Sequence, residues 1–334
     1  MSSQPLQPAS WRVCVAPMID VTDRHCRYFH RLLHPRARLY TEMLSTGAVL
    51  HGNAARHLAF DEAEHPVALQ LGGSEPGDLV RAARIGAEAG YDEINLNCGC
   101  PSDRVQRGAF GACLMASPSL VADCVRAMQD AVSVPVTVKH RLGLDYEDSY
   151  AFVRDFVGTL HEAGCRVFIV HARNAVLKGL SPKDNREIPP LRYDRAAQLK
   201  RDFPDSVFVL NGGIATVEQS RCHLETFDGV MLGRAAWHDP AVLTRLWLAL
   251  EPDAREIDGD AVVTAMAAYA ARRVAEGTPM RLVLRSMLDW SLGRPGARRW
   301  RQRLSDAQSL AANDPGLLLA AWEELKAASR AQEQ

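Results

Sequence analysis

Short apolar runs rich in β-branched residues recur along the first three-quarters of the chain, and a segment with helical spacing follows each run. Residues 78–89 are typical of these segments, because Leu79, Ala82, Ala83 and Ile85 share one helical face. The predicted strands are residues 12–18, 37–43, 66–72, 93–98, 134–140, 166–173, 207–213 and 228–233. Eight such units over about 230 residues fit a TIM (β/α)8 barrel, whereas a doubly wound open sheet usually has fewer strands. We therefore predict an α/β fold, a TIM barrel.

The pattern changes after Leu250. Residues 251–260 are polar and contain proline and glycine, and no strand-like run follows them. Three helix-like segments follow instead, at 261–273, 278–292 and 317–328. We predict a barrel domain over residues 1–250 and an all-helical domain over residues 255–334. The length of 334 residues favours two domains, because single cores rarely grow beyond about 250–300 residues.

The composition is that of a folded protein without a membrane span. Hydrophobic residues make up 47% of the chain and charged residues 24%, which argues against long disordered regions. The formal net charge is −1, so a nucleic-acid partner would have to bind local basic patches. No run of about 18 apolar residues occurs, and the N-terminus lacks the pattern of a secretory signal. Most of the cysteines lie in apolar runs or helical segments, as reduced thiols do, so we expect a cytoplasmic protein.

Polar or charged side chains end seven of the eight predicted strands. These residues are Glu42, Gln70, Asn95, Asn97, Lys139, His171, Asn211 and Arg234. A single one is more often a turn residue, but burying the whole set without partners would be costly. In a TIM barrel the strand ends form the active-site face, so the set predicts a polar ligand at the barrel mouth.

Glycines follow the last two predicted strands. Gly212 and Gly213 come after Asn211, and Gly233 precedes Arg234. TIM barrels often bind phosphate between these two loops through backbone N–H groups, and Thr216 could cap the helix that follows the first loop. The glycines could instead only form tight turns, but the two loops together with a cation favour a phosphate site.

Lys139, His171 and Cys100 are the candidates for chemistry. Lys139 ends an apolar run and should face an electron-rich ligand, unless it forms an ion pair with Glu42 or another carboxylate of the barrel. His171, taken alone, is more often a core histidine bonded to the backbone. Cys100 lies between Gly99 and Pro101, a sharp loop that would hold its sulfur at the mouth as a nucleophile, a general acid or a metal ligand.

Two further features surround Cys100. The Cys98–Cys100 pair is a weak zinc pattern without a second Cys/His pair, and we expect no metal. The polar, glycine-containing segment 104–111 is typical of a loop that closes over a site.

The motifs together resemble those of flavin-dependent tRNA-dihydrouridine synthases. The resemblance rests on APMIDVTDRHCR at 16–27, YTEM at 40–43, VALQLGG at 67–73, EINLNCGCPSDRVQRGAFGACLM at 93–115, VTVKHRLG at 136–143, VHAR at 170–173, LNGGI at 210–214 and GVMLGRAA at 229–236. The segments HRLGLDYEDSY, VLKGLSPKDNREIPPLRY and PGARRWR are similar to the A-type of the family, whose members reduce uridines 20 and 20a in the D-loop of tRNA.

The resemblance implies that FMN lies across the barrel mouth. Its binding residues would be Pro17, Met18, Ile19, Gln70, Lys139, His171, Asn211, Gly212, Gly213, Gly233 and Arg234. NADPH (or NADH) would reduce FMN, the flavin N5 would deliver hydride to C6 of uracil, and Cys100 would protonate C5. Asn97 would hold the flipped-out uracil by its polar edge.

A tRNA substrate would also explain the arginines near the C-terminus. Arg294, Arg298, Arg299, Arg301 and Arg303 are interleaved with Trp290 and Trp300, a combination that suits phosphate contacts and base stacking. A solvated arginine face is the alternative. We expect Lys183, Arg186, Arg298 and Arg301 to contact tRNA, with Lys178 on the same barrel loop as the first two.

Two other functions fit parts of the pattern. A flavin barrel acting on a free small molecule, similar to dihydroorotate dehydrogenase, would share the glycine loops and the lysine but would not need the arginine-rich tail. A non-catalytic tRNA-binding protein would not need Cys100, Lys139, His171 and Arg234 together. We expect no obligate protein partner.

Overall fold

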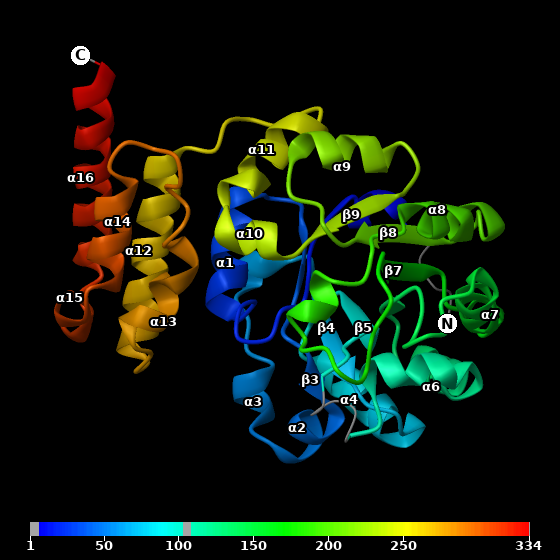
Figure 1. The fold of residues 1–334 in the computed structure, drawn as a ribbon. Coiled ribbons are helices and arrows are strands. Elements are labelled where there is room, and N and C mark those ends of the chain that lie inside the picture. Colours follow the sequence, from blue (N-terminus) through cyan, green and yellow to red (C-terminus); the bar gives the residue numbers. More distant parts are fainter. Residues whose placement is uncertain (1–6, 103–107, 334) are drawn as a thin grey trace. The chain divides into compact units, whose positions relative to one another are not determined.

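The computed structural model describes residues 7–102 and 108–333, in which eight parallel strands form a closed barrel (Figure 1). They are β1 (Val13–Val15), β2 (Arg38–Tyr40), β4 (Val67–Gly72), β5 (Glu93–Cys98), β6 (Val136–His140), β7 (Val167–His171), β8 (Val207–Asn211) and β9 (Gly229–Leu232). The pairing of β9 with β1 and of β2 with β4 closes the ring, and the short β3 (Leu44–Ser45) extends the edge of β4. The predicted TIM barrel is confirmed, and each predicted apolar run contains one strand.

Helices follow the strands as the hydrophobic pattern predicts. They are α2 (Thr46–His51), α3 (Ala54–His57), α4 (Pro76–Glu88), α6 (Pro118–Ala131), α7 (Tyr150–Glu162), α8 (Tyr193–Asp202) and α9 (Val217–Leu224), with short 3₁₀ turns η1 (Pro8–Trp11), η2 (Glu62–Glu64), η3 (Gly111–Ala116) and η4 (Asp184–Arg186). Proline occupies the first turn of α4 and α6, where no backbone N–H is needed. Ser149 caps α7 by accepting a hydrogen bond from the backbone N–H of Phe152.

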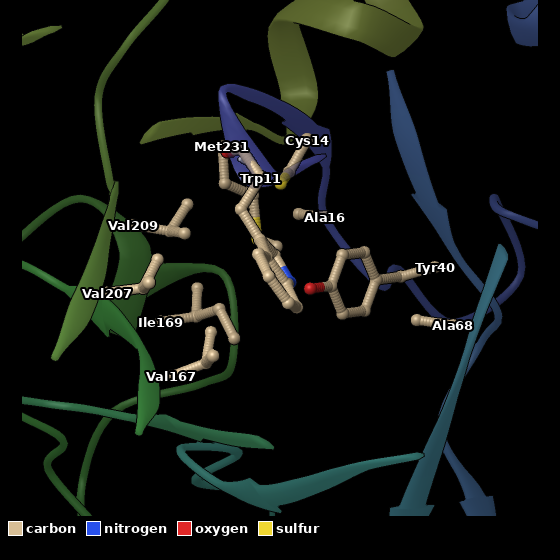
Figure 2. Packing of buried hydrophobic residues seen from close by; sticks show 10 residues of the cluster. All are labelled: Trp11, Cys14, Ala16, Tyr40, Ala68, Val167, Ile169, Val207, Val209 and Met231. Carbon is tan, nitrogen blue, oxygen red and sulfur yellow. Dashed lines mark hydrogen bonds between the residues drawn. The ribbon is translucent and has the colours of Figure 1, made fainter. Parts of the chain in front are cut away.

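The barrel interior has an apolar side and a polar side. Valine, isoleucine and methionine side chains of β7, β8 and β9 pack around the indole of Trp11, and Figure 2 shows the Tyr40 hydroxyl pointing toward that ring. Across the barrel, β4, β5 and β6 bury Gln70, Glu93, Asn95 and Thr137. Successive strand residues alternate between the interior and the helices, so every second residue of β5 places a polar group inside.

The chain packs into two compact units. Among the described residues, the first comprises those of Met1–Asp20, Ala37–Ile214 and Glu218–Gly233 and contains the barrel strands. The second comprises Val21–Arg36, Ala215–Val217 and the residues from Arg234 onward. Packing thus groups segments from before and after residue 250, and the predicted domains 1–250 and 255–334 stay a prediction.

The second unit is helical, and the described residues after 250 contain no strand, as expected. Its helices are α1 (Arg24–Leu33), α10 (Arg234–His238), α11 (Ala241–Leu250), α12 (Gly259–Ala275), α13 (Met280–Leu284), α14 (Ala297–Ser305), α15 (Ala307–Ala311) and α16 (Gly316–Glu333), with the 3₁₀ turn η5 (Arg285–Met287). The prediction of one helix over 278–292 is wrong past residue 287. The chain turns there to bring Trp290 into the core of the unit, and Gly293 and Gly296 adopt positive φ angles before α14 begins.

Three tryptophans form that core. The ring of Trp290 stacks on that of Trp322 with centroids 5.2 Å apart, and Trp300 meets both rings edge-on. Trp300 also donates its indole N–H to the Met287 carbonyl at 2.9 Å and is 1% exposed. The prediction that Trp290 and Trp300 stack on RNA bases is therefore wrong, because their rings are used in packing. None of the described helices is long and apolar enough to cross a bilayer.

Candidate active site at the barrel mouth

A row of amide side chains leads up the polar side of the barrel to the loop that holds Cys100. Gln70 Nε2 donates to Asn95 Oδ1 at 2.8 Å, and Asn97 Nδ2 donates to Gln70 Oε1 at 2.8 Å. Asn97 Oδ1 then accepts the backbone N–H groups of Gly99 and Cys100, both at 3.0 Å. A side-chain oxygen that binds two consecutive backbone N–H groups fixes a sharp turn. The turn predicted around Cys100 is present, and Asn97 holds it.

The Cys100 side chain is half-buried at the end of β5, whereas Cys98 is fully buried within the strand. The Cys100 sulfur lies 3.5 Å from Ser102 Oγ. The backbone carbonyl of Cys100 accepts a hydrogen bond from the backbone N–H of Ala112 at 2.9 Å. Of the predicted loop 104–111, residues 104–107 lie outside the described residues.

Arg141 connects the Cys100 turn to the loop that follows β7. It is buried and donates to the carbonyl of Gly99 at 3.1 Å, to that of Asn174 at 3.2 Å and to that of Asn185 at 3.0 Å. Burial lowers the pKa of Arg141 to about 10, which leaves the guanidinium charged at neutral pH. Asn185 is itself buried and donates to three carbonyls of its own loop, those of Val176, Leu180 and Ser181.

Two basic side chains interact electrostatically with the Cys100 thiol, those of Arg141 and Lys139. Lys139 pairs with Asn97 in the β5–β6 register, and burial together with Arg141 lowers the pKa of Lys139 to about 7. Among the described residues no carboxylate acts on Lys139, and Glu42 instead accepts the backbone N–H of Asp20 at 2.5 Å. The alternative of a Lys139–Glu42 ion pair is therefore wrong.

His171 ends β7, the strand next to that of Lys139, and pairs with Asn211 in the β7–β8 register. Burial, with Arg141 and Lys139 nearby, lowers the pKa of His171 well below its usual value, so the ring is neutral. Its Nδ1 atom is buried and has no hydrogen-bond partner within the described part of the chain. The alternative of a core histidine bonded to the backbone through Nδ1 is not observed.

The glycine loop after β8 adopts backbone conformations that residues with side chains rarely take. Gly212 and Gly213 have φ angles of +114° and +72°. A methyl group on Gly213 would come within 2.7 Å of Leu191 Cδ1 and 2.9 Å of the Tyr193 hydroxyl. Asn211 Nδ2 donates to the Met231 carbonyl at 2.7 Å and so joins the two strands that carry the loops. Gly233 ends the second loop, and Arg234 is the first residue of α10.

A model of the dihydrouridine synthase family matches residues 14–329 of the chain. The chain belongs to this family. It is 60% identical over 297 residues to the tRNA-dihydrouridine(20/20a) synthase of Pseudomonas syringae pv. tomato, which covers 89% of this chain and 88% of the relative. Proteins of the same name from Salmonella typhimurium and Escherichia coli K12 are each 53% identical over 92% of this chain, with 93% and 90% of their own lengths covered.

Dihydrouridine synthases use a flavin, and several features of the mouth fit one. Within the described residues, His171 Nδ1 has no hydrogen-bond partner and the Lys139 ammonium has no carboxylate, so both are polar groups suited to a ligand. Gly212 and Gly213 adopt consecutive positive φ angles, as in loops whose backbone N–H groups bind a phosphate. Met18 lies beside Gly233, with its sulfur 3.8 Å from where a methyl group on that glycine would be. Ile19 is exposed beyond Pro17 and Met18 on the same loop.

The predicted tRNA-contacting residues lie on two surfaces, each described within its own unit. Lys183 and Arg186 are exposed at η4 on the loop after β7. In the helical unit, Arg298 and Arg301 line a shallow groove of about 570 Å³ together with Leu288 and Leu292. Arg301 also pairs with Asp289 at 2.5 Å, whereas Arg298 has no acidic partner among the described residues.

Four of the five arginines of the tail, all but Arg303, are exposed, as the alternative of a solvated arginine face expects, but part of the tail also has partners. Arg299 and Arg303 both pair with Glu324, and the Arg294 guanidinium lies 5.0 Å from the Trp322 ring centroid. These three arginines therefore have partners within the unit.

Three residues of the polar network of the mouth were not predicted from the sequence: Glu93, Thr137 and Arg141. Glu93 and Thr137 lie inside β5 and β6, where a polar residue in an otherwise apolar run could have drawn attention to them. Arg141 follows Lys139 by two residues, the spacing that puts both side chains on one side of an extended chain. What the sequence could not supply is which distant residues they meet.

Proposed function

We propose that the protein reduces the C5=C6 bond of uridines 20 and 20a in the D-loop of tRNA to give 5,6-dihydrouridine, with FMN as cofactor and NADPH as reductant. The observation that carries the proposal is the placement of the Cys100 thiol at the barrel mouth, on a turn held by Asn97 and next to Lys139 and Arg141. The relatives named tRNA-dihydrouridine(20/20a) synthase support the same substrate.

Each residue of the mouth has a defined task in this proposal. A bound FMN would supply hydride to C6 of the uracil ring. Cys100 holds the proton that C5 receives, since a positioned cysteine thiol can act as a general acid. Lys139 places a positive charge where reduced flavin carries negative charge, and its lowered pKa lets it gain or lose a proton near pH 7.

The remaining residues bind and orient. Pro17, Met18 and Ile19 support one side of the flavin ring system, and Gln70 and neutral His171 hydrogen-bond to its polar edge. The backbone of Asn211, Gly212, Gly213 and Gly233, with the Arg234 side chain, binds its phosphate. The amide of Asn97 binds the uracil, which must leave the RNA stack to reach the pocket.

Binding of tRNA is assigned to Lys183 and Arg186 on the barrel and to Arg298 and Arg301 on the helical domain, residues 255–334. Cations spread over two surfaces suit a folded RNA with phosphates on many sides. A tRNA substrate also places the protein in the cytoplasm.

The deciding experiment compares Cys100→Ala with Cys113→Ala, a matched control because Cys113 is also half-buried and lies on the same segment beyond the turn. Each variant is purified with flavin, mixed with tRNA that lacks dihydrouridine, and followed by single turnover and by mass mapping of the modified positions. We expect Cys100→Ala to keep flavin and tRNA binding and to lose turnover by about 10²-fold or more, the usual share of a general acid. Cys113→Ala should turn over as wild type.

Wild-type turnover by Cys100→Ala would refute the assignment of the proton donor. A wild-type preparation that takes up no flavin, or that binds tRNA without dependence on salt concentration, would refute the proposed function itself.

A further inference from the structure

A continuous chain of hydrogen bonds joins the buried carboxylate of Glu93, at the start of β5, to the turn that holds Cys100. Thr137 Oγ1 donates to Glu93 Oε1 at 2.5 Å and accepts from Asn95 Nδ2 at 2.7 Å. From Asn95 the chain continues through Gln70 to Asn97 and ends at the backbone N–H groups of Gly99 and Cys100. Every link lies inside the barrel, and Glu93, Asn95 and Thr137 are completely buried.

The chain has a direction, and Glu93 sets it. Besides Thr137, the carboxylate accepts from the indole N–H of Trp11 and from the Tyr40 hydroxyl, both at 2.8 Å, and it pairs with Arg38 at 3.2 Å. Indole and guanidinium groups can only donate, so position 93 must present acceptors to them. Because residue 93 is a carboxylate, its second oxygen, which faces Thr137, is an acceptor as well. The Thr137 hydroxyl therefore donates to Glu93 and accepts from Asn95.

Each amide of the chain is then oriented by the group to which it is hydrogen-bonded. Thr137 accepts from the Asn95 amide nitrogen, which turns the Asn95 oxygen toward Gln70. Gln70 therefore presents its oxygen to Asn97, and Asn97 presents its own oxygen to the turn. An amide rotated the other way would place two donors or two acceptors against each other, which is costly in a buried site.

We propose that Glu93 is a positioning residue for Cys100, acting through Thr137, Asn95, Gln70 and Asn97 to keep the oxygen of Asn97 aimed at the backbone N–H groups of the turn. Its importance for turnover rests on the proposed function, because it depends on Cys100 as proton donor. The hydrogen-bond relay itself is a property of the chain and can be tested without any substrate.

The substitution Glu93→Gln reverses the relay while keeping the size of the side chain. The amide oxygen of the new side chain must face Trp11 and Arg38, so its NH₂ group faces Thr137. The Thr137 hydroxyl then has no acceptor at position 93, and it regains one by donating to Asn95, which drives each amide of the chain to rotate in turn. At the top, the Asn97 NH₂ group meets two backbone N–H donors and the turn loses its hydrogen bonds.

The readout is the rate at which Cys100 of the flavin-free protein is alkylated by iodoacetamide, measured by peptide mass spectrometry. The exposed thiol of Cys222 is the internal reference, because it lies outside the barrel interior. We expect Glu93→Gln to raise the Cys100 rate relative to Cys222 by about fivefold or more, the population change that follows the loss of one ordinary hydrogen bond. In the flavin-loaded enzyme, the single-turnover rate with tRNA should fall.

Thr137→Val tests the same relay from its second link and is the variant to use if Glu93→Gln does not fold. It removes the hydroxyl through which Glu93 orients the Asn95 amide. The alkylation rate of Cys100 should therefore rise about two- to threefold, the effect of weakening one hydrogen bond. Thr137→Ser restores the hydroxyl and should return the wild-type rate. In the double variant with Glu93→Gln and Thr137→Val, the first substitution should have no further effect. Cys100 should then be alkylated at the rate measured for Thr137→Val by itself.

An unchanged Cys100 rate in folded Glu93→Gln and in Thr137→Val overturns the proposal. So does a rise shared by the buried Cys98, since that reports loosening of the whole barrel. If the relay variants change Cys100 reactivity while Cys100→Ala keeps full turnover, the relay stands and the proposed function fails.

Discussion

The buried histidine of β6 makes the stability of the barrel sensitive to acid. His140 is fully buried, donates its Nδ1–H to the Arg141 carbonyl at 2.7 Å, and packs against Phe156 and Phe168. Its Nε2 atom is buried without a partner in the described structure. Burial lowers the pKa of His140 to about 4, so the folded protein keeps this ring neutral.

The size and sign of the effect follow from this pKa. In the unfolded chain the ring titrates near pH 6.5, so between pH 6.5 and 4 the unfolded state binds a proton that the folded state does not. The contribution to stability is complete above pH 6.5 and is lost as the pH falls through this window. For a pKa of about 4, the loss between pH 7 and pH 5 is about 2 kcal/mol.

The assay is urea unfolding of the wild type and of His140→Phe at pH 7 and at pH 5. The variant should be less stable at pH 7 by about 1–3 kcal/mol, because the Arg141 carbonyl loses its donor. From pH 7 to pH 5, however, the free energy of unfolding of the variant should fall by about 2 kcal/mol less than that of the wild type. The other buried histidines titrate alike in both proteins, so the difference belongs to His140. Equal losses in the two proteins would refute the reasoning.

Two further predictions concern the ligand-binding residues. Gly213→Ala should lower flavin affinity and cost about 1–3 kcal/mol in urea unfolding, because a methyl group would meet Leu191 at a left-handed φ; Gly179→Ala, also at positive φ but with open space around it, should leave flavin affinity unchanged. Equal flavin affinities for both variants would contradict this. Arg298→Ala should weaken tRNA binding and reduce the slope of log affinity against log salt by about one, without change in flavin content. An unaltered slope in filter binding would show that Arg298 contacts no phosphate.

The strands and the mouth could be predicted because their causes are local. A buried parallel strand needs a short apolar run, and the last residues of the run lie at the mouth end of the barrel. The turn at Cys100 and the two glycine loops follow from backbone preferences of glycine and proline. These features need no knowledge of distant partners.

The partners of buried polar groups could not be predicted in this way. Glu93 is surrounded by residues from positions 11, 38, 40 and 137, which only the closure of the barrel brings together. The interruption of the predicted helix at 278–292 has a similar origin, since Trp290 leaves helical geometry to stack on Trp322, more than thirty positions away. Tertiary packing overrides local preference at both places.

The stacked indoles of the helical unit give the protein an internal optical probe. The rings of Trp290 and Trp322 are nearly parallel, with 12° between their planes, and Trp300 stands at 64° and 74° to them. Aromatic chromophores this close share their excited states, so the trio should produce a paired band in the far-ultraviolet circular dichroism spectrum that separated rings would not give. Melting of this unit can therefore be followed without a label, while the visible colour of a flavin would report on the barrel in the same cuvette.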